Sequence, residues 1–156
     1  MSFNLLKGKR GIIFGALNDA SIAWKVAERV VEEGAQIVLT NTAVACRMGT
    51  IDELAKKTGA TIIPADATSV EDLTNLFVEA QKALGGKIDF VLHSCAMSVN
   101  MRKKRTYDDL DYSFLSKTLD ISAISFHKML QAAKKLDALN ECASVQIGRA
   151  SCRERV

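Results

Sequence analysis

The sequence alternates short apolar runs with longer stretches in which apolar residues recur every three or four positions. The short runs are typical of buried strands and the longer stretches of amphipathic helices. The runs that predict strands are Arg10–Phe14, Ala35–Thr40, Thr61–Ala65 and Ile88–His93, with a fifth strand expected to begin at Ser144–Val145. The stretches that predict helices are Ser21–Glu33, Thr50–Thr58, Ser69–Leu84 and about Tyr112–Leu136.

Single residues at the ends of these elements support the boundaries. Gly34 and Gly59 follow two of the predicted helices, where glycine commonly ends a helix. Ser69 is a suitable N-cap, with Asp72 three residues further on. Pro64 lies in the third strand and predicts an edge position, because proline has no N–H to donate to a neighbouring strand.

The regular alternation of strand and helix predicts the fold class. Helical crossovers make the strands parallel and cover both faces of the sheet. We therefore expect an α/β protein with a Rossmann-type, doubly wound parallel sheet, truncated after about four strands in the order 3-2-1-4. Residues 1–145 are assigned to this incomplete dinucleotide-binding domain. We also expect the truncation to leave the fourth strand as an unpaired edge.

Residues 146–156 follow neither the strand period nor the helix period. From Ile147 onward the residues match the in-frame translation of a common DNA-sequencing adapter. We interpret residues 146–156 as a non-native tail and leave them out of the fold. A genuine arginine-rich terminus is the alternative.

Composition is that of an ordinary globular protein, with 48% hydrophobic and 25% charged residues. The net charge of +3 depends on arginines in the tail, and without the tail it falls to about +1. Charge therefore gives no reason to expect nucleic-acid binding. No apolar stretch approaches the roughly 18 residues that a membrane span needs.

The cysteines show neither metal-ligand nor disulfide spacing; they are Cys46, Cys95, Cys142 and Cys152. The first ten residues contain no apolar segment of the kind that secretory signals carry. We therefore expect reduced thiols, no metal site and a cytoplasmic location.

In a doubly wound sheet the binding crevice lies at the carboxyl ends of the strands, where the strand order reverses. The loop after the first strand begins at Gly15, and the next helix opens at Ser21. Backbone N–H groups at that helix start would face a pyrophosphate. The loop lacks a G-x-G-x-x-G pattern, so by itself it fits a cofactor loop and an ordinary turn equally well.

The pattern Gly15-x5-Ser21-x-Ala23 resembles the divergent short-chain dehydrogenase/reductases, particularly the enoyl-acyl-carrier-protein reductases. The resemblance extends from Leu5 to Val145. The other segments that carry it are Ala65–Ala67, His93–Met97, Asp120–Ser122 and Ser125–Phe126.

The resemblance implies a set of cofactor-binding residues on four loops and one helix. They are Gly15, Ala16, Ser21, Ile22, Thr42, Asp66, Ala67, Ser94, Cys95, Ala96 and Ile121. By resemblance, Asp66 and Ala67 flank the adenine, and the segment from Ser94 lies beside the nicotinamide ribose. A methyl group at Ala96, where relatives have glycine, would crowd the cofactor. The resemblance also implies that Ser98 lies near the mouth of the substrate site.

The implied cofactor is NADH, although no acidic residue follows the second strand to hold a ribose 2′-hydroxyl. Arg47 is near enough to meet a 2′-phosphate, so NADPH is not excluded. The implied activity is the reduction of trans-2-enoyl thioesters on acyl carrier protein in fatty-acid synthesis. The implied assembly of the complete protein is a homotetramer. The alternatives are a catalytically silent NAD(P)-binding module and another short-chain dehydrogenase/reductase.

The family's catalytic residues are a tyrosine after the fifth strand and a Tyr-x6-Lys pair beyond it. None has a counterpart here, so no catalytic residue is assigned, and Tyr107 and Tyr112 are not candidates. We expect this chain by itself to be inactive and poorly stable. We interpret His93 as a core histidine rather than an acid/base, and Arg102–Arg105 as a solvated loop rather than a docking site for the carrier.

Overall fold

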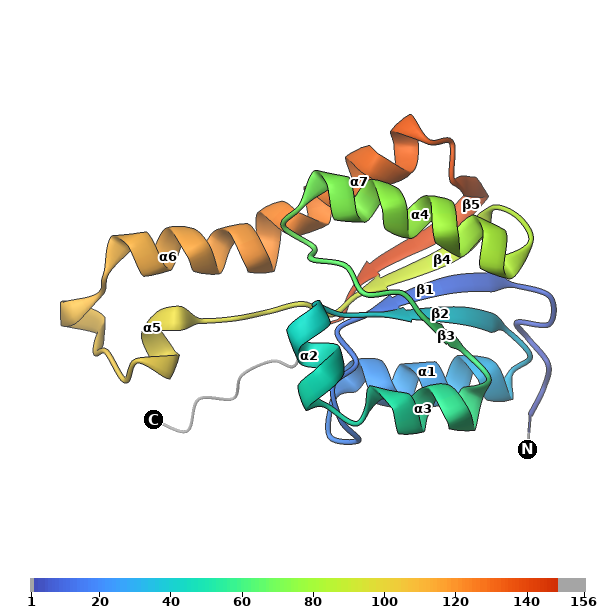
Figure 1. Cartoon of the computed structure of the whole chain (residues 1–156), viewed down its shortest axis with the longest axis horizontal. Coiled ribbons are helices and arrows are strands. Elements are labelled where there is room, and N and C mark those ends of the chain that lie inside the picture. Colours follow the sequence, from blue (N-terminus) through green and yellow to red (C-terminus); the bar gives the residue numbers. More distant parts are fainter. Residues whose placement is uncertain (1, 149–156) are drawn as a thin grey trace.

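A computed structural model of the chain describes residues 2–148 and contains one parallel sheet in the order β3-β2-β1-β4-β5 (Figure 1). The strands are β1 (Arg10–Phe14), β2 (Gln36–Thr40), β3 (Thr61–Ile62), β4 (Ile88–His93) and β5 (Leu139–Ile147). The predicted α/β class and the order 3-2-1-4 are confirmed, and β5 extends the sheet beyond β4.

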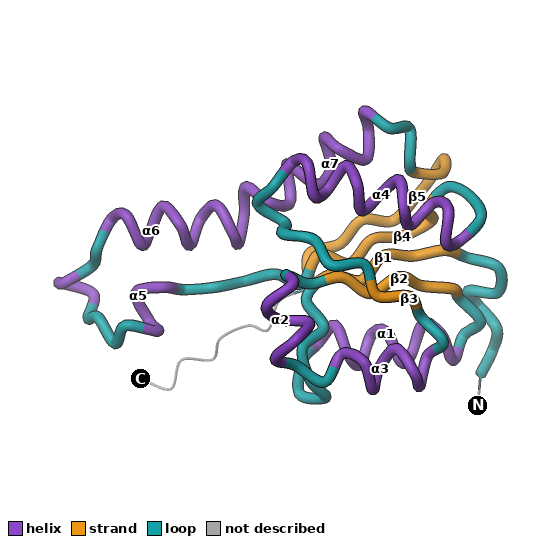
Figure 2. The backbone as a smooth tube through the Cα atoms, in the orientation of Figure 1, coloured by secondary structure: helices purple, strands orange, loops and turns teal. Residues whose placement is uncertain are grey.

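Helices cover both faces of the sheet, as doubly wound crossovers require (Figure 2). One face carries α1 (Ile22–Glu32) and α3 (Ile51–Thr58), and the other carries α4 (Val70–Leu84) and α7 (Ser125–Lys135). Successive side chains of β1 point to opposite faces of the sheet and pack in the two helix layers in turn. Ile12 and Phe14 belong to the cluster with α4 and α7, while Ile13 belongs to the cluster with α1 and α3.

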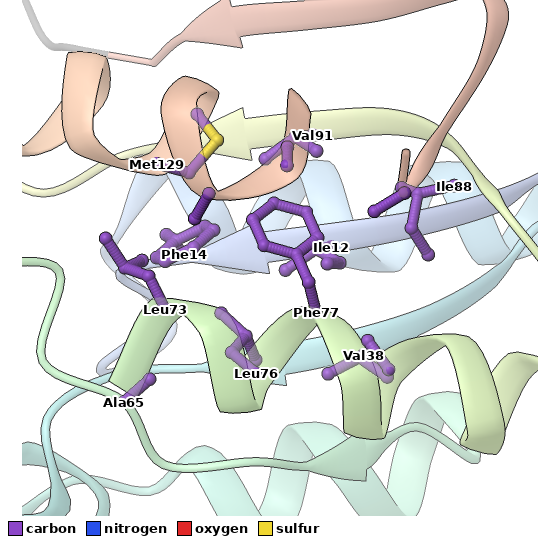
Figure 3. Packing of buried hydrophobic residues seen from close by; sticks show 14 of the residues in the cluster. Ile12, Phe14, Val38, Ala65, Leu73, Leu76, Phe77, Ile88, Val91 and Met129 are labelled. Atoms are coloured by element: carbon purple, nitrogen blue, oxygen red, sulfur yellow. The ribbon is translucent and has the colours of Figure 1, made fainter. Parts of the chain in front are cut away.

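The core between the sheet and α4 forms because the apolar stripe of this helix meets the inner residues of three strands (Figure 3). Leu73, Leu76 and Phe77 are fully buried there, and Met129 of α7 closes the cluster beside Phe14. The predicted buried stripe of the helix is therefore confirmed. Burial of each large apolar side chain contributes about 1.5–3 kcal/mol, so this layer supplies much of the fold's stability.

The predicted helix ends are confirmed at three points. The Ser69 hydroxyl accepts a hydrogen bond from the Asp72 N–H at 3.2 Å and caps α4. Gly34 follows the C-cap Glu33 of α1, Gly59 is the C-cap of α3, and both have a positive φ, of 91° and 68°.

The third strand is shorter than predicted. β3 contains only Thr61 and Ile62, and Pro64 interrupts the pairing that was expected to reach Ala65. The chain nevertheless follows β2, because the N–H groups of Ile63 and Ala65 donate to Leu39 and Asn41, each at 3.0 Å. The predicted edge position of this strand is confirmed by the strand order.

Two short helices were missed, and a third helix is less regular than expected. The missed helices are α2 (Ala43–Met48) and α5 (Val99–Arg102). α2 contains no buried residue and so leaves no apolar stripe in the sequence. The long helix predicted from Tyr112 is divided into α6 (Tyr112–Leu119), a π-helical segment η2 (Asp120–Ile124) and α7. Such π segments occur frequently at functional sites.

The prediction that β4 is an unpaired edge is wrong, because β5 pairs with it in parallel. β5 begins at Leu139, five residues before the predicted start. The register shifts within the pair, and Cys142 has a φ of 61°, so the regular alternation that marks a strand is lost there. Gln146 and Ile147, which the sequence analysis assigned to the tail, pair with Leu92 and His93. Residues 149–156 lie outside the described residues, and the origin of the tail stays a prediction.

Between β4 and the π segment the chain projects away from the sheet as an arm (Figure 1). We define the arm as residues 98–119; it contains α5 (Val99–Arg102), a 3-10 turn η1 (Tyr107–Asp109) and α6. Its large exposed apolar side chains are Met101, Tyr107, Tyr112 and Leu119. Across residues 2–148, every helix is too short or too polar to cross a bilayer.

Candidate cofactor-binding site

The loops after β1 and β4 approach each other closely at Gly15. Its φ is +87°, and a Cβ placed there would lie 2.2 Å from the carbonyl oxygen of Ser94. Only glycine fits, because any side chain would both clash and strain the backbone. Gly15 therefore brings two of the predicted cofactor loops together at the switch point of the sheet, between β1 and β4.

The start of α1 is open to a ligand. Ser21 stands at the N-cap, but its hydroxyl donates to the Asn18 carbonyl at 2.7 Å and accepts from the Leu17 N–H at 3.4 Å. No side chain among residues 2–148 caps the helix, and its first turn contains no acidic residue. The first N–H groups of α1 and the positive end of the helix dipole are thus available to an anion such as a phosphate.

Asn41 joins the loops after β1 and β2. Its Nδ2 donates to the Ala16 carbonyl at 3.1 Å, and its Oδ1 accepts from the Thr42 N–H at 2.9 Å. Thr42 in turn caps α2 by accepting from the Ala45 N–H at 3.2 Å. The predicted residues Ala16 and Thr42 therefore share one bridging amide. Sequence reasoning missed Asn41, although a side-chain amide directly after a buried strand was a usable signal.

The loop after β3 is a closed turn around Asp66. The Asp66 carboxylate accepts from the N–H and the hydroxyl of Thr68 at 2.8 and 2.7 Å. Asp66 thus caps a turn. The side chain of Ala67 is buried in the core, so Ala67 can offer a ligand only its backbone.

The loop after β4 is held from two sides. The Ser94 hydroxyl donates to the Gly148 carbonyl at 2.7 Å. The Ser122 hydroxyl, in the π segment, lies 3.1 Å from the Met97 nitrogen and 3.2 Å from its carbonyl oxygen. Ile121, another predicted cofactor residue, neighbours Ser122 and is half-buried. The methyl of Ala96 is exposed, whereas Cys95 packs against the core.

The remaining candidates lie at the base of the arm and under the loops. Ser98 caps α5 by accepting from the Met101 N–H at 3.4 Å. Tyr107 and Tyr112 lie on the arm and are 93% and 78% exposed. His93 is fully buried between Phe14 and Phe126, so its interpretation as a core residue is confirmed.

Cys46 and Cys142 are free thiols. Within residues 2–148, no group of three or more His, Cys, Asp or Glu side chains is arranged to hold a metal ion. Cys152 lies outside the described residues.

A doubly wound parallel sheet with an open helix start at its switch point defines a Rossmann-type nucleotide-binding fold. The comparisons with known proteins narrow this class. The family model of enoyl-(acyl carrier protein) reductase matches residues 15–154. The chain belongs to this family.

Similar proteins carry the same name. The chain is 34% identical over 146 residues to enoyl-[acyl-carrier-protein] reductase [NADH] FabI of Rickettsia bellii (strain RML369-C), covering 93% of this chain and 54% of the relative. It is 34% identical over 142 residues to enoyl-[acyl-carrier-protein] reductase [NADH] 1 of Rhizobium meliloti (strain 1021), covering 90% and 51%. The chain therefore spans about half the length of the curated relatives it matches.

Solved structures agree with the fold. The FabI–NADH complex of Alistipes finegoldii matches with a TM-score of 0.93 and 64% identity, over 98% of this chain and 54% of that one. The NAD complex of the enoyl-(acyl-carrier-protein) reductase from Anaplasma phagocytophilum matches with a TM-score of 0.82 and 28% identity, over 94% and 55%.

Proposed function

We propose that this chain is the N-terminal, cofactor-binding part of an enoyl-[acyl-carrier-protein] reductase and that it binds NADH. The observation that carries the proposal is the open start of α1 beside Gly15, where the loops after β1 and β4 meet. Phosphate binds favourably at such a helix start. The similarity to a FabI–NADH complex supports the choice of cofactor.

Within this proposal each loop meets one part of the cofactor. Backbone from Gly15 and Ala16 and the helix start at Ser21 and Ile22 hold the pyrophosphate, with Thr42 beside the adenosine ribose. Asp66 and the Ala67 backbone flank the adenine. The nicotinamide end meets Ser94, Cys95, Ala96 and Ile121, and Ser98 lies at the substrate mouth.

NADH is proposed over NADPH on the names of the relatives, which specify NADH. Thr42 and Arg47 are both exposed near the end of β2, and this loop carries no acidic residue. Arg47 is the cation that would favour a 2′-phosphate. Titration with both cofactors decides between them, and NADPH binding as tight as NADH binding would contradict the choice.

For the whole protein we propose hydride transfer from NADH to the β-carbon of a trans-2-enoyl thioester on acyl carrier protein, in fatty-acid synthesis. The assembly proposed is a homotetramer in the cytoplasm, and the exposed apolar residues of the arm would contribute to its interfaces. Residues 1–156 contain no Tyr-x6-Lys pair to donate a hydrogen bond to the enolate oxygen. This chain is therefore expected to bind NADH without turnover.

The binding proposal is tested by titrating the chain with NADH and following nicotinamide fluorescence. Ala96→Leu places a larger side chain where the cofactor must approach, and the fold should tolerate it because Ala96 is exposed. The control is Ala83→Leu, at an exposed position of α4. We expect binding to survive in the control and to be lost in Ala96→Leu. Equal affinity in both variants would contradict the proposed site.

The proposal for the whole protein is tested on the source DNA. Amplification across codon 145, with about 400 further bases read, should show the frame continuing into a Tyr-x6-Lys pair. A frame that reads Ile147–Val156 and then stops would favour the silent NAD(P)-binding module instead.

A further inference from the structure

Lys128 in α7 connects two segments that are far apart in the sequence. Its ammonium group donates to the carbonyl oxygen of Thr68 at 2.9 Å and to Oδ1 of Asp120 at 2.8 Å. Thr68 lies in the turn between β3 and α4, and Asp120 opens the π segment. The Lys128 side chain is 25% exposed, so both contacts are partly shielded from water.

The π segment also contacts the loop after β4, which lies at the proposed nicotinamide end of the crevice. Ser122 contacts both the nitrogen and the carbonyl oxygen of Met97, in the loop after β4. Asp120 and Ser122 are two residues apart in the same segment. One short piece of helix therefore contacts the β4 loop directly and the β3 loop through Lys128.

The turn that Lys128 contacts is also held by its own residues, by α4 and by the core. Asp66 accepts from the N–H groups of Thr68 and Ser69, through its carboxylate and its carbonyl, and its own N–H donates to Asp72 of α4 at 2.9 Å. Ala67 is buried in the core cluster shared with α4 and α7. The Lys128 ammonium adds a polar link from α7 to the Thr68 carbonyl, and a charged donor makes this bond stronger than a neutral one.

We propose that Lys128 is a positioning residue that anchors the turn at residues 66–68 to the π segment and so sets the separation of the adenine and nicotinamide ends of the crevice. The proposal rests on the proposed NADH site. Lys128 acts through Thr68 and Asp120 and contributes no group to the cofactor.

The first test measures the anchor without any ligand. Lys128→Met removes the donors and keeps the length of the side chain, and Lys135→Met is the control in the exposed last turn of the same helix. Amide hydrogen exchange at Thr68 and Ser69 should accelerate about tenfold in Lys128→Met, the factor expected for one lost charge-assisted hydrogen bond. Exchange in β1 and β4 should not change. Equal exchange at Thr68 and Ser69 in the two variants would overturn the proposal.

The second test measures binding with NADH and with reduced nicotinamide mononucleotide, which lacks the adenosine half. Lys128→Met should weaken NADH binding about five- to tenfold and leave binding of the mononucleotide unchanged. Lys128→Arg, which keeps a cationic donor, should restore NADH affinity. Equal weakening of both ligands would indicate general loosening and overturn the positioning role. If the unsubstituted chain binds neither ligand, the proposed function fails, and the exchange experiment still decides whether Lys128 anchors the turn.

Discussion

The hydroxyl of Ser125 lies 2.9 Å from Nε2 of His93, and both residues are completely buried. The same hydroxyl donates its hydrogen to the carbonyl oxygen of Ile121 at 2.7 Å. With its hydrogen on the Ile121 carbonyl, the hydroxyl can only accept from His93, in the tautomer that carries the hydrogen on Nε2. This pair joins the end of β4 to the first residue of α7, directly beneath the proposed nicotinamide loop.

Removing the Ser125 hydroxyl should destabilise the fold. Ser125→Ala leaves the buried Nε2 of His93 without this hydrogen-bond partner, which costs about 1–3 kcal/mol in the free energy of unfolding. The control, Ser116→Ala, changes an exposed serine of α6 and should leave stability within about 0.5 kcal/mol. Urea unfolding followed by circular dichroism measures both, and equal midpoints would show that the pair does not stabilise the fold.

Two glycines with positive φ should respond differently to alanine. Gly59 has open space around its missing Cβ, so Gly59→Ala should cost only the left-handed backbone strain of about 1–2 kcal/mol. Gly15→Ala adds the clash with the Ser94 carbonyl and should cost about 1–3 kcal/mol more. It should also abolish NADH binding. The measurements are urea unfolding and NADH titration, and equal losses of stability would contradict the close approach.

Asp89 should make stability depend on pH. Burial acts to raise the pKa of its carboxyl group, but hydrogen bonds from the Arg10 N–H, Asn140 and Lys9 outweigh burial and hold that pKa below its ordinary value. The charged form therefore stabilises the fold above the unfolded-state pKa of about 3.9, and this contribution is lost as pH falls through the lower folded-state pKa.

The test is Asp89→Asn, compared with the unsubstituted chain at pH 7 and at pH 3 or below. At pH 7 the variant should be less stable by about 1–2 kcal/mol, because charged acceptors make the stronger hydrogen bonds. The difference should shrink as the native carboxyl becomes protonated. Urea midpoints across this range check the prediction, and a difference independent of pH would refute it.

Two free cysteines should differ in reactivity. Burial raises the pKa of the Cys46 thiol, and the negative charge of Asp52 adds to this effect. Cys46 thus carries little thiolate at pH 8, whereas Cys142 is exposed. Iodoacetamide should modify Cys142 about tenfold faster than Cys46, as read by peptide mass spectrometry. Similar rates would show that Cys46 is more accessible than the structure indicates.

The elements predicted correctly are those whose signals are local. The alternation of apolar runs with amphipathic stretches predicted the order 3-2-1-4, and Ser69 and Gly59 marked helix ends through their own hydrogen bonding and φ. The errors lie where local signals are absent. α2 buries no residue, and the β5 register shift breaks the period that identifies a strand.

By itself the sequence determined the fold class, the amphipathic helices and which loops lie at the carboxyl ends of the strands, because side-chain period and strand order depend on local chemistry and chain connectivity. Only the tertiary structure decided how those loops are joined. Asn41 to Ala16, Ser122 to Met97 and Lys128 to Thr68 are contacts between residues 25 to 60 positions apart. No pattern along the chain encodes such pairs, because packing of the sheet and its helices brings them within hydrogen-bonding distance.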